Sequence, residues 1–180
     1  MRAAADAEAA WRRWRDVRDD LFRSHPQSPL PEADRASFAG LEYFPYDPGL
    51  RVVADVEPAR PESLRIQGSA GLVAQFTRFG DARFELGGTA CALELYWLEG
   101  YGGGVFLPFN DRTTGHETYG GGRYLLDTVK GADLGGEEGR LVLDFNFAYN
   151  PSCAYDVRWA CPLAPAANTL ELAVRGGERL

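Results

Sequence analysis

The densest collection of chemically active side chains lies between residues 109 and 124, where the sequence reads FNDRTTGHETYGGGRY. A carboxylate close to a phenol and a guanidinium could transfer a proton to or from a bound molecule and hold an anionic group. We therefore take Glu117 as a candidate catalytic acid or base. Tyr119 and Arg123 are candidate ligand-binding residues, with Arg123 contacting an anionic group of the ligand.

A second polar group follows residues 141–148, where apolar and polar side chains alternate. This alternation predicts a strand with Asp144 and Asn146 on the same face. If Asp144 and Glu117 share a water-poor pocket, their repulsion separates their pKa values and provides an acid and a base. Asp144 is therefore the second candidate catalytic residue. The remaining candidate ligand-binding residues are Asn146, Asn150 and Tyr155.

The same residues allow a purely structural interpretation. Asp and Asn beside a strand commonly cap turns, and Tyr hydroxyls often join the corners of a barrel. A polar scaffold without a ligand is thus an equal alternative to a polar pocket.

Metal and cofactor chemistry receive less support. His25 and His116 are the only histidines, so a three-histidine metal centre is excluded. Cys153 and Cys161 could join His116, but their spacing matches no common zinc pattern, and we predict no metal site. Cys91 is the third cysteine, and the absence of a C-x-x-C motif favours free thiols. The sequence identifies no cofactor.

Two further motifs resemble catalytic or phosphate-binding sequences, but their surroundings do not fit those functions. The segment 68–71 reads GSAG, which lacks the spacing of a nucleophilic serine elbow. The glycines at 120–122 precede a predicted strand, whereas a phosphate-binding loop precedes a helix.

Composition and charge restrict the partners. The chain has 180 residues, a formal net charge of −7 and a pI near 4.9, so no basic field attracts nucleic acid or anionic lipid. The first residues lack the apolar core of a secretory signal, and no later run approaches the ~18 apolar residues of a membrane span. We therefore expect a cytoplasmic monomer or homodimer with a possible small-molecule ligand.

The elements that must position these residues belong to one domain, 1–180. Trp11, Trp14, Val17 and Leu21 recur at helical spacing, so residues 1–26 contain one amphipathic helix that ends before Pro26. Residues 27–50 form an aromatic, proline-rich connector. Residues 51–180 form an antiparallel β body. The predicted fold class is mainly β: an antiparallel β-barrel or strongly curved β-sandwich with an N-terminal α-helix.

Short runs rich in β-branched and aromatic residues predict roughly nine or ten strands. We place a hairpin turn at Gly80-Asp81 and a second hairpin tip at Gly102–Gly104. The predicted strands are Arg51–Val56, Ser63–Gln67, Leu72–Phe79, Arg83–Leu86, Ala90–Leu98, Val105–Phe109, Arg123–Val129, Arg140–Ala148, Tyr155–Trp159 and Thr169–Val174.

Several blocks of the sequence carry a family resemblance. ETYGGGRYL at 117–125 and DFNFAYNPSCAY at 144–155 are long enough to be specific, and the match extends over nearly the whole chain. On these blocks the chain resembles domain-of-unknown-function family 1684 of bacteria and archaea. The resemblance implies a shared architecture and a shared polar centre, without an established activity. The chain departs from the family pattern at Ala164 and Ala167, which replace a proline and a glutamate.

Two functions remain open from the sequence. The first is a small-molecule-binding barrel whose polar pocket could support carboxylate acid/base chemistry. The alternative is a non-catalytic interaction or structural module. In that case the aromatic segment Tyr43–Tyr46 and the N-terminal helix form a dimer or partner surface.

Overall fold

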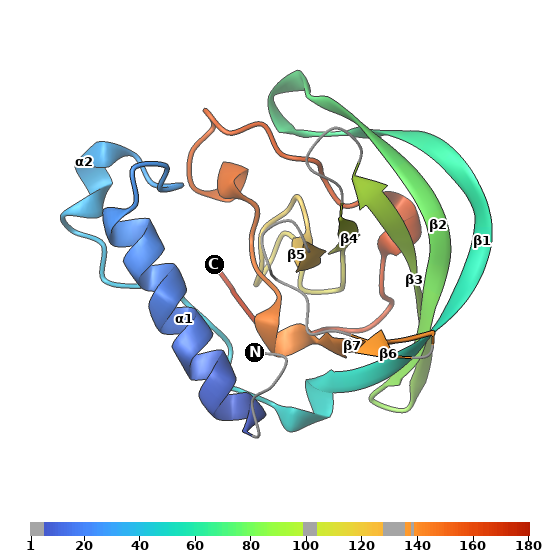
Figure 1. Ribbon diagram of the computed structural model, residues 1–180. Coiled ribbons are helices and arrows are strands. Elements are labelled where there is room, and N and C mark those ends of the chain that lie inside the picture. The colour runs from blue at the N-terminus through green and yellow to red at the C-terminus, as the bar shows by residue number, and fades with distance from the viewer. Residues whose placement is uncertain (1–5, 99–103, 128–135, 138) are drawn as a thin grey trace.

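The computed structural model describes residues 6–98, 104–127, 136–137 and 139–180. The N-terminal helix α1 spans Ala7–Ser24, and the short helix α2 spans Glu32–Arg35. Both lie to one side of a curved sheet (Figure 1). The predicted helix is confirmed.

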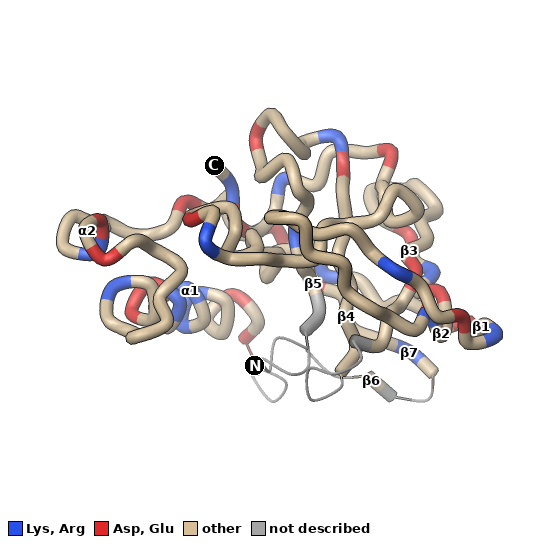
Figure 2. Tube along the Cα trace, turned by 90° about the horizontal axis from the view of Figure 1, so that it is seen from above, with Lys and Arg blue, Asp and Glu red and all other residues tan. Residues whose placement is uncertain are grey.

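Local chemistry fixes the bounds of α1. The Asp6 side chain caps its first turn by accepting a hydrogen bond from the Ala9 N–H at 3.0 Å. His25 leaves the helical conformation just before Pro26. One face of α1 buries Ala10, Trp11 and Phe22 against the body of the protein. Basic and acidic residues are mixed along α1 (Figure 2).

The sheet contains seven strands in the described residues, in the order β5-β4-β3-β2-β1-β7-β6, and every adjacent pair is antiparallel. The strands are β1 Arg51–Gln67, β2 Val73–Leu86, β3 Thr89–Leu98, β4 Val105–Phe109, β5 Arg123–Asp127, β6 Gly136–Glu137 and β7 Arg140–Asp144. The long strands β1, β2 and β3 curve around the interior (Figure 1). The predicted fold class is confirmed in the form of an antiparallel half-barrel, with β5 and β6 as the two ends of the sheet.

The predicted turn at Gly80-Asp81 is wrong, because β2 continues through it. The register of β2 against β3 shifts between Arg78 and Gly80, which marks a bulge. Only glycine fits there, since a Cβ on Gly80 would lie 2.8 Å from the Glu57 carbonyl oxygen. A glycine that permits close backbone approach inside a strand thus resembles a turn signal in the sequence. The predicted runs Arg51–Val56 and Ser63–Gln67 likewise belong to one strand, β1.

The hairpin that joins β3 to β4 is confirmed by the pairs Tyr96↔Phe106 and Trp97↔Val105. Part of its predicted tip, residues 102 and 103, lies outside the described residues, as do residues 128 and 129 at the end of the predicted strand after Arg123.

Three predicted strand segments differ from the structure. The strand at 140–148 ends at Asp144, because the Asp144 side chain caps a short 3-10 helix over Phe145–Phe147. Residues 155–159 form turns rather than a strand, and residues 169–174 have a single bridge, Asn110↔Thr169. From the first and third of these segments, Phe145, Leu170 and Val174 pack against the sheet instead of extending it.

A hydrophobic cluster packs on each face of the sheet. One face packs an aliphatic cluster around Leu95, Leu107 and Phe145, covered by the segment that includes Leu170 and Val174. The other face carries an aromatic cluster, with Trp14 of α1 packed against its edge. The buried members of that aromatic cluster are Ile66, Phe76, Tyr96, Phe106, Tyr124 and Tyr149.

The aromatic connector and α1 pack on each other. The Trp11 ring lies 6.3 Å from that of Tyr43 and 5.5 Å from that of Tyr46 between centroids. The Trp14 ring lies 5.9 Å from Tyr43 and 5.2 Å from Phe147. The residues expected to offer a partner surface therefore contact one another within one chain.

Candidate functional site

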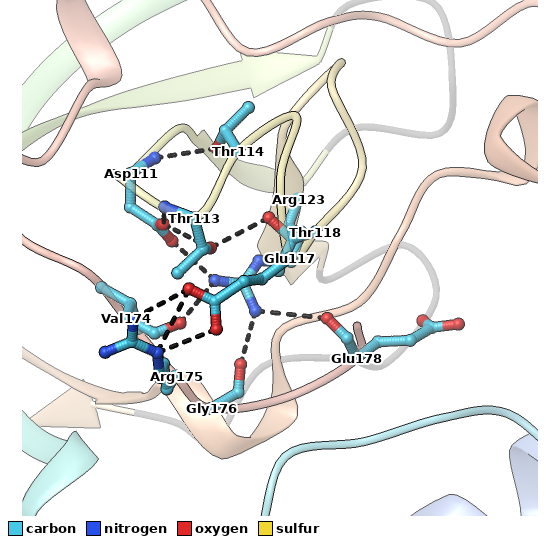
Figure 3. Close-up of polar contacts among 10 residues, drawn as sticks. All are labelled: Asp111, Thr113, Thr114, Glu117, Thr118, Arg123, Val174, Arg175, Gly176 and Glu178. Atoms are coloured by element: carbon cyan, nitrogen blue, oxygen red, sulfur yellow. Dashed lines mark hydrogen bonds and ion pairs between the residues drawn. The ribbon is translucent and has the colours of Figure 1, made fainter. Parts of the chain in front are cut away.

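Arg123, at the start of β5, is the centre of a polar network in the interior (Figure 3). Only 1% of the residue is exposed. Its Nη2 donates to Asp111 Oδ2 at 2.6 Å and to the Val174 carbonyl at 2.9 Å. Its Nη1 donates to the carbonyls of Gly176 and Glu178. The guanidinium thus holds the C-terminal segment onto β5.

This network satisfies the buried charge of Arg123 from within the chain. Burial lowers the pKa of the guanidinium, and the Asp111 carboxylate opposes that shift. The two charges form an internal ion pair, with side chains 1% and 0% exposed. An anionic ligand at Arg123 would have to displace Asp111, so these contacts favour the scaffold interpretation of this residue.

The loop after β4 presents Asp111 to Arg123. Asp111 Oδ1 accepts 2.5 Å hydrogen bonds from the N–H and the hydroxyl of Thr113, and the Thr113 hydroxyl lies 3.0 Å from that of Thr118. The Asp111 N–H in turn donates to the Thr114 hydroxyl at 3.0 Å. Asp111 was not among the predicted site residues. The pattern Asp-x-Thr is a local signal for such a turn, although it does not identify the distant arginine.

Glu117 lies at the surface end of the same loop. Its carboxylate receives three hydrogen bonds of 2.8–3.2 Å from Arg175 (Figure 3). These hydrogen bonds lower the pKa of Glu117. A carboxylate held in its charged form is poorly suited to donate a proton near neutral pH.

Asp144 is fully buried at the end of β7. Its Oδ1 accepts hydrogen bonds from the Asn146 N–H at 3.0 Å and the Asn146 side-chain amide at 2.8 Å. Its Oδ2 pairs with Arg51 at 3.1 Å. The predicted proximity of Asp144 and Asn146 is present, but it comes from a helix cap rather than from strand alternation. Glu117 and Asp144 belong to separate ion pairs, and no described contact joins them.

Asn146 links three other parts of the chain. Its side chain accepts from the Asp47 N–H at 2.9 Å and donates to the Asp47 carbonyl at 2.8 Å, and its carbonyl accepts from Trp11 Nε1 at 2.8 Å. Asn146, which we predicted to bind a ligand, therefore joins the connector and β7 through its side-chain amide and α1 through its backbone carbonyl.

The structure predicts that Asp144→Asn destabilises the protein. The substitution removes the charge that holds Arg51 and weakens the cap on Phe145–Phe147, so the free energy of unfolding should fall by about 1–3 kcal/mol. Urea unfolding of the purified variant measures this loss. Arg83→Gln is the matched control and should cost less, because both side chains of its ion pair with Glu57 are more than half exposed. An unchanged midpoint for Asp144→Asn would contradict the scaffold role.

Asn150 and Tyr155 lie near a buried carboxylate at the C-terminus. The Asn150 N–H donates to Glu178 Oε2 at 2.9 Å, and Arg18 of α1 pairs with the same oxygen at 2.8 Å. Burial raises the pKa of Glu178, against the effect of Arg18. The Tyr155 ring packs edge-on against Phe22, with 4.7 Å between centroids. Among the described residues, Asn150 Oδ1, Tyr155 Oη and Glu178 Oε1 are buried oxygens for which the structure shows no hydrogen-bond partner.

Tyr119 belongs to a different neighbourhood. Its hydroxyl lies 3.6 Å from Cys153 Sγ. The predicted site residues thus belong to a surface ion pair, to buried polar networks around Arg123, Asp144 and Glu178, to an aromatic contact with Phe22 and to a thiol neighbourhood.

A cavity of about 510 Å³ lies elsewhere, between the aromatic face of the sheet and the segment 163–167. Leu64 and Ile66 of β1 share this face with Phe76 and Tyr96, because the registers pair Leu64 with Phe76 and Arg78 with Tyr96. The lining consists of Leu64, Arg65, Ile66, Gln67, Glu94, Tyr96, Leu163, Ala164, Pro165 and Ala167. Both positions that depart from the family pattern, Ala164 and Ala167, are among them.

An acidic polar cluster forms one side of this cavity. Glu94 accepts from the Tyr96 hydroxyl at 2.5 Å and pairs with Arg78 at 3.0 Å, and Arg78 also pairs with Asp81 at 2.6 Å. The Glu94 and Asp81 side chains remain 27% and 21% exposed. Burial and the Glu94 carboxylate raise the pKa of Tyr96. Two carboxylates against one guanidinium leave this cluster with a net negative charge.

The described part of the chain contains no group of three or more His, Cys, Asp or Glu side chains arranged to hold a metal ion. None of its helices combines the length and the apolar character that crossing a bilayer requires.

The fold places this chain in the class of mainly β proteins, as an antiparallel half-barrel with a long N-terminal helix. The chain belongs to the family described as protein of unknown function DUF1684, whose model matches residues 36–179. It is also similar to an uncharacterized protein of Haloarcula marismortui known from a solution NMR structure. The identity is 38%, the TM-score is 0.70, and the match covers 96% of this chain and 94% of that one. No curated protein matches the sequence.

Proposed function

We propose that this protein binds a small molecule with an apolar body and a cationic amine in the cavity beneath residues 163–167. The observation that carries the proposal is a cavity of about 510 Å³ with a partly exposed carboxylate, Glu94, in its lining. This volume is in the range of ligand pockets in proteins. The proposal moves the ligand away from the Arg123 network.

The chemistry of the lining selects the ligand class. Leu64, Ile66 and Leu163 offer apolar contact to the body of a ligand. A carboxylate has about four lone-pair positions, and the described contacts of Glu94 use two of them, so it can accept a further hydrogen bond. An ammonium group suits that position because the neighbouring Asp81 adds a second negative charge and Arg78 only one positive charge. Arg65 also belongs to the lining, but it alternates with Leu64 and Ile66 along β1 and so lies on the other face of the strand from these apolar residues.

A catalytic role of Glu117 and Asp144 stays a prediction of the sequence. Their contacts favour the polar scaffold that the same pattern allowed, so the proposed function is binding. The cytoplasmic location is a further part of this proposal, supported by the three cysteines in thiol form, which are typical of a reducing compartment. The monomeric or homodimeric state is part of it as well.

Calorimetric titration with two probes tests the ligand class. Tryptamine has an aromatic body and an ammonium group, and indole-3-propionate has the same body with a carboxylate. We expect tryptamine to bind more tightly, and Glu94→Gln to weaken tryptamine binding about tenfold, which is about 1.4 kcal/mol. Equal binding of the two probes to wild type, or an unchanged tryptamine affinity of Glu94→Gln, would contradict the proposed role of the carboxylate.

A matched pair of tryptophan substitutions tests the position of the site. Ala167→Trp places a large side chain in the cavity lining, whereas Ala166 is its exposed neighbour outside that lining. Tryptamine binding should be lost in Ala167→Trp and retained in Ala166→Trp. Retention by both variants would place the ligand elsewhere.

A further inference from the structure

Cys153 and Cys161 lie together beside the phenol of Tyr119, away from the Arg123 network. Cys153 belongs to the short 3-10 helix Ser152–Ala154 and is buried, with 8% of its surface exposed. Its sulfur lies 3.6 Å from the Tyr119 hydroxyl and interacts with the side chains of Cys161 and Ser69. Three polar side chains therefore surround one sulfur atom.

The backbone holds Cys161 in this place. The Cys161 N–H donates to Ser69 Oγ at 2.9 Å, and the Ser69 N–H donates to the Cys161 carbonyl at 2.9 Å. Residue 68 must be glycine, because a Cβ there would lie 2.6 Å from the Cys161 carbonyl oxygen. The second thiol is thus fixed next to the first by contacts between segments about ninety residues apart.

These side chains stabilise negative charge on the sulfur. The hydrogen bond from Cys161, followed by those from Ser69 and Tyr119, lowers the pKa of Cys153 to about 6. Burial and the contact with Cys153 raise the pKa of Tyr119 to about 12, so the phenol keeps its proton at neutral pH. Burial raises the pKa of Cys91, the remaining cysteine. Of Cys153 and Cys91, Cys153 is therefore the thiol whose surroundings favour the thiolate form.

We propose that Cys153 and Cys161 form a peroxide-reactive pair, in which Cys153 attacks a hydroperoxide and Cys161 resolves the product to a disulfide. The small size of hydrogen peroxide suits a buried sulfur whose neighbours Tyr119 and Cys161 are partly exposed. A bulky disulfide oxidant could not reach Cys153 as easily. This inference is independent of the proposed ligand site.

The proposed reaction has two steps. The Cys153 thiolate attacks one peroxide oxygen, the S–O bond forms, the O–O bond breaks, and hydroxide leaves and becomes water with a proton from solvent. The sulfur loses two electrons to the peroxide. The Cys161 sulfur then attacks the sulfenic acid, the S–S bond forms, the S–O bond breaks, and the thiol proton leaves with the departing oxygen as a second water.

The expected rate advantage is modest. At pH 7 a pKa of about 6 instead of 9 gives about ninetyfold more thiolate. The lower basicity reduces the nucleophilicity of that thiolate by about twentyfold. Cys153 should therefore react at least about fourfold faster than a thiol of ordinary pKa, and faster still than Cys91.

The test exposes reduced full-length protein to one equivalent of hydrogen peroxide at pH 7, followed by alkylation and peptide mass spectrometry. Wild type should yield a linked 153–161 peptide and alkylated Cys91. Cys161→Ser should instead accumulate a sulfenic acid at Cys153 that dimedone traps. Cys91→Ser is the matched control and should behave as wild type.

Two variants separate reactivity from folding. Tyr119→Phe removes one polar contact of the Cys153 sulfur and should raise the pH midpoint of Cys153 alkylation above that of wild type, for which we expect about 6. Cys153→Ser should consume peroxide at the rate of its remaining thiols. The proposal is overturned if wild type oxidises no faster than Cys153→Ser, if Cys91 is oxidised first, or if no 153–161 disulfide forms.

Discussion

Replacing Arg123 by methionine is expected to lower the free energy of unfolding by about 3–5 kcal/mol, because the substitution removes one partner of a buried ion pair. The Asp111 carboxylate would stay in the interior without its counter-charge. The carbonyls of Val174 and Gly176 would lose their buried donor as well. For a chain of this length the thermal midpoint should fall by on the order of 10 °C.

Arg175→Met is the matched control for Arg123→Met. Arg175 forms an exposed ion pair with Glu117, so its loss should leave the thermal midpoint close to that of wild type. Arg123→Met combined with Asp111→Asn should recover part of the lost stability, since it also removes the uncompensated charge. A stable Arg123→Met variant that only loses ligand affinity would show that the guanidinium serves a ligand rather than the fold.

Replacing Trp11 by alanine is the second substitution with a large expected effect. Trp11 is 4% exposed, its indole N–H donates to the Asn146 carbonyl at 2.8 Å, and Arg15 lies over its ring at 4.6 Å from the centroid. Truncation of so large a buried side chain costs about 3–5 kcal/mol. Chemical denaturation monitored by circular dichroism measures the loss.

The control for Trp11→Ala is Val17→Ala on the exposed side of the same helix, where Val17 is 65% exposed and its truncation should have little effect. The pair also tests the interaction-module alternative. If Trp11→Ala kept wild-type stability while dissociating an oligomer in light scattering, Trp11 would belong to a partner surface rather than to the core.

The elements with strong periodicity were predictable from sequence. The helix spacing of Trp11 and Trp14 and the strand patterns of β3 and β4 depend on local residue types, which the sequence contains. The turn at Gly80 and the strand at 155–159 were wrong because their outcome depends on long-range pairing. A glycine in a bulge and a glycine in a turn share one requirement, little steric bulk.

The sequence indicated the candidate polar residues more readily than it indicated which residues contact one another. Asp144 does meet Asn146, as the alternating pattern predicted, and both Arg123 and Asp144 are buried. The partners of Arg123 are carbonyls some fifty residues away, which no local pattern identifies. The cavity was missed for the same reason. Glu94 lies in an ordinary strand pattern, and its role in the cavity depends on the distant segment 163–167, which lines the same space.

The most direct test of the proposed binding site is a titration of 15N-labelled wild-type protein with tryptamine, followed by amide chemical shifts. We predict that the shifts concentrate in residues 64–67, 94–96 and 163–167, which surround the cavity. Shifts centred on residues 111–123 and 144–155, or no shift at millimolar tryptamine, would contradict the proposal that this cavity is the ligand site.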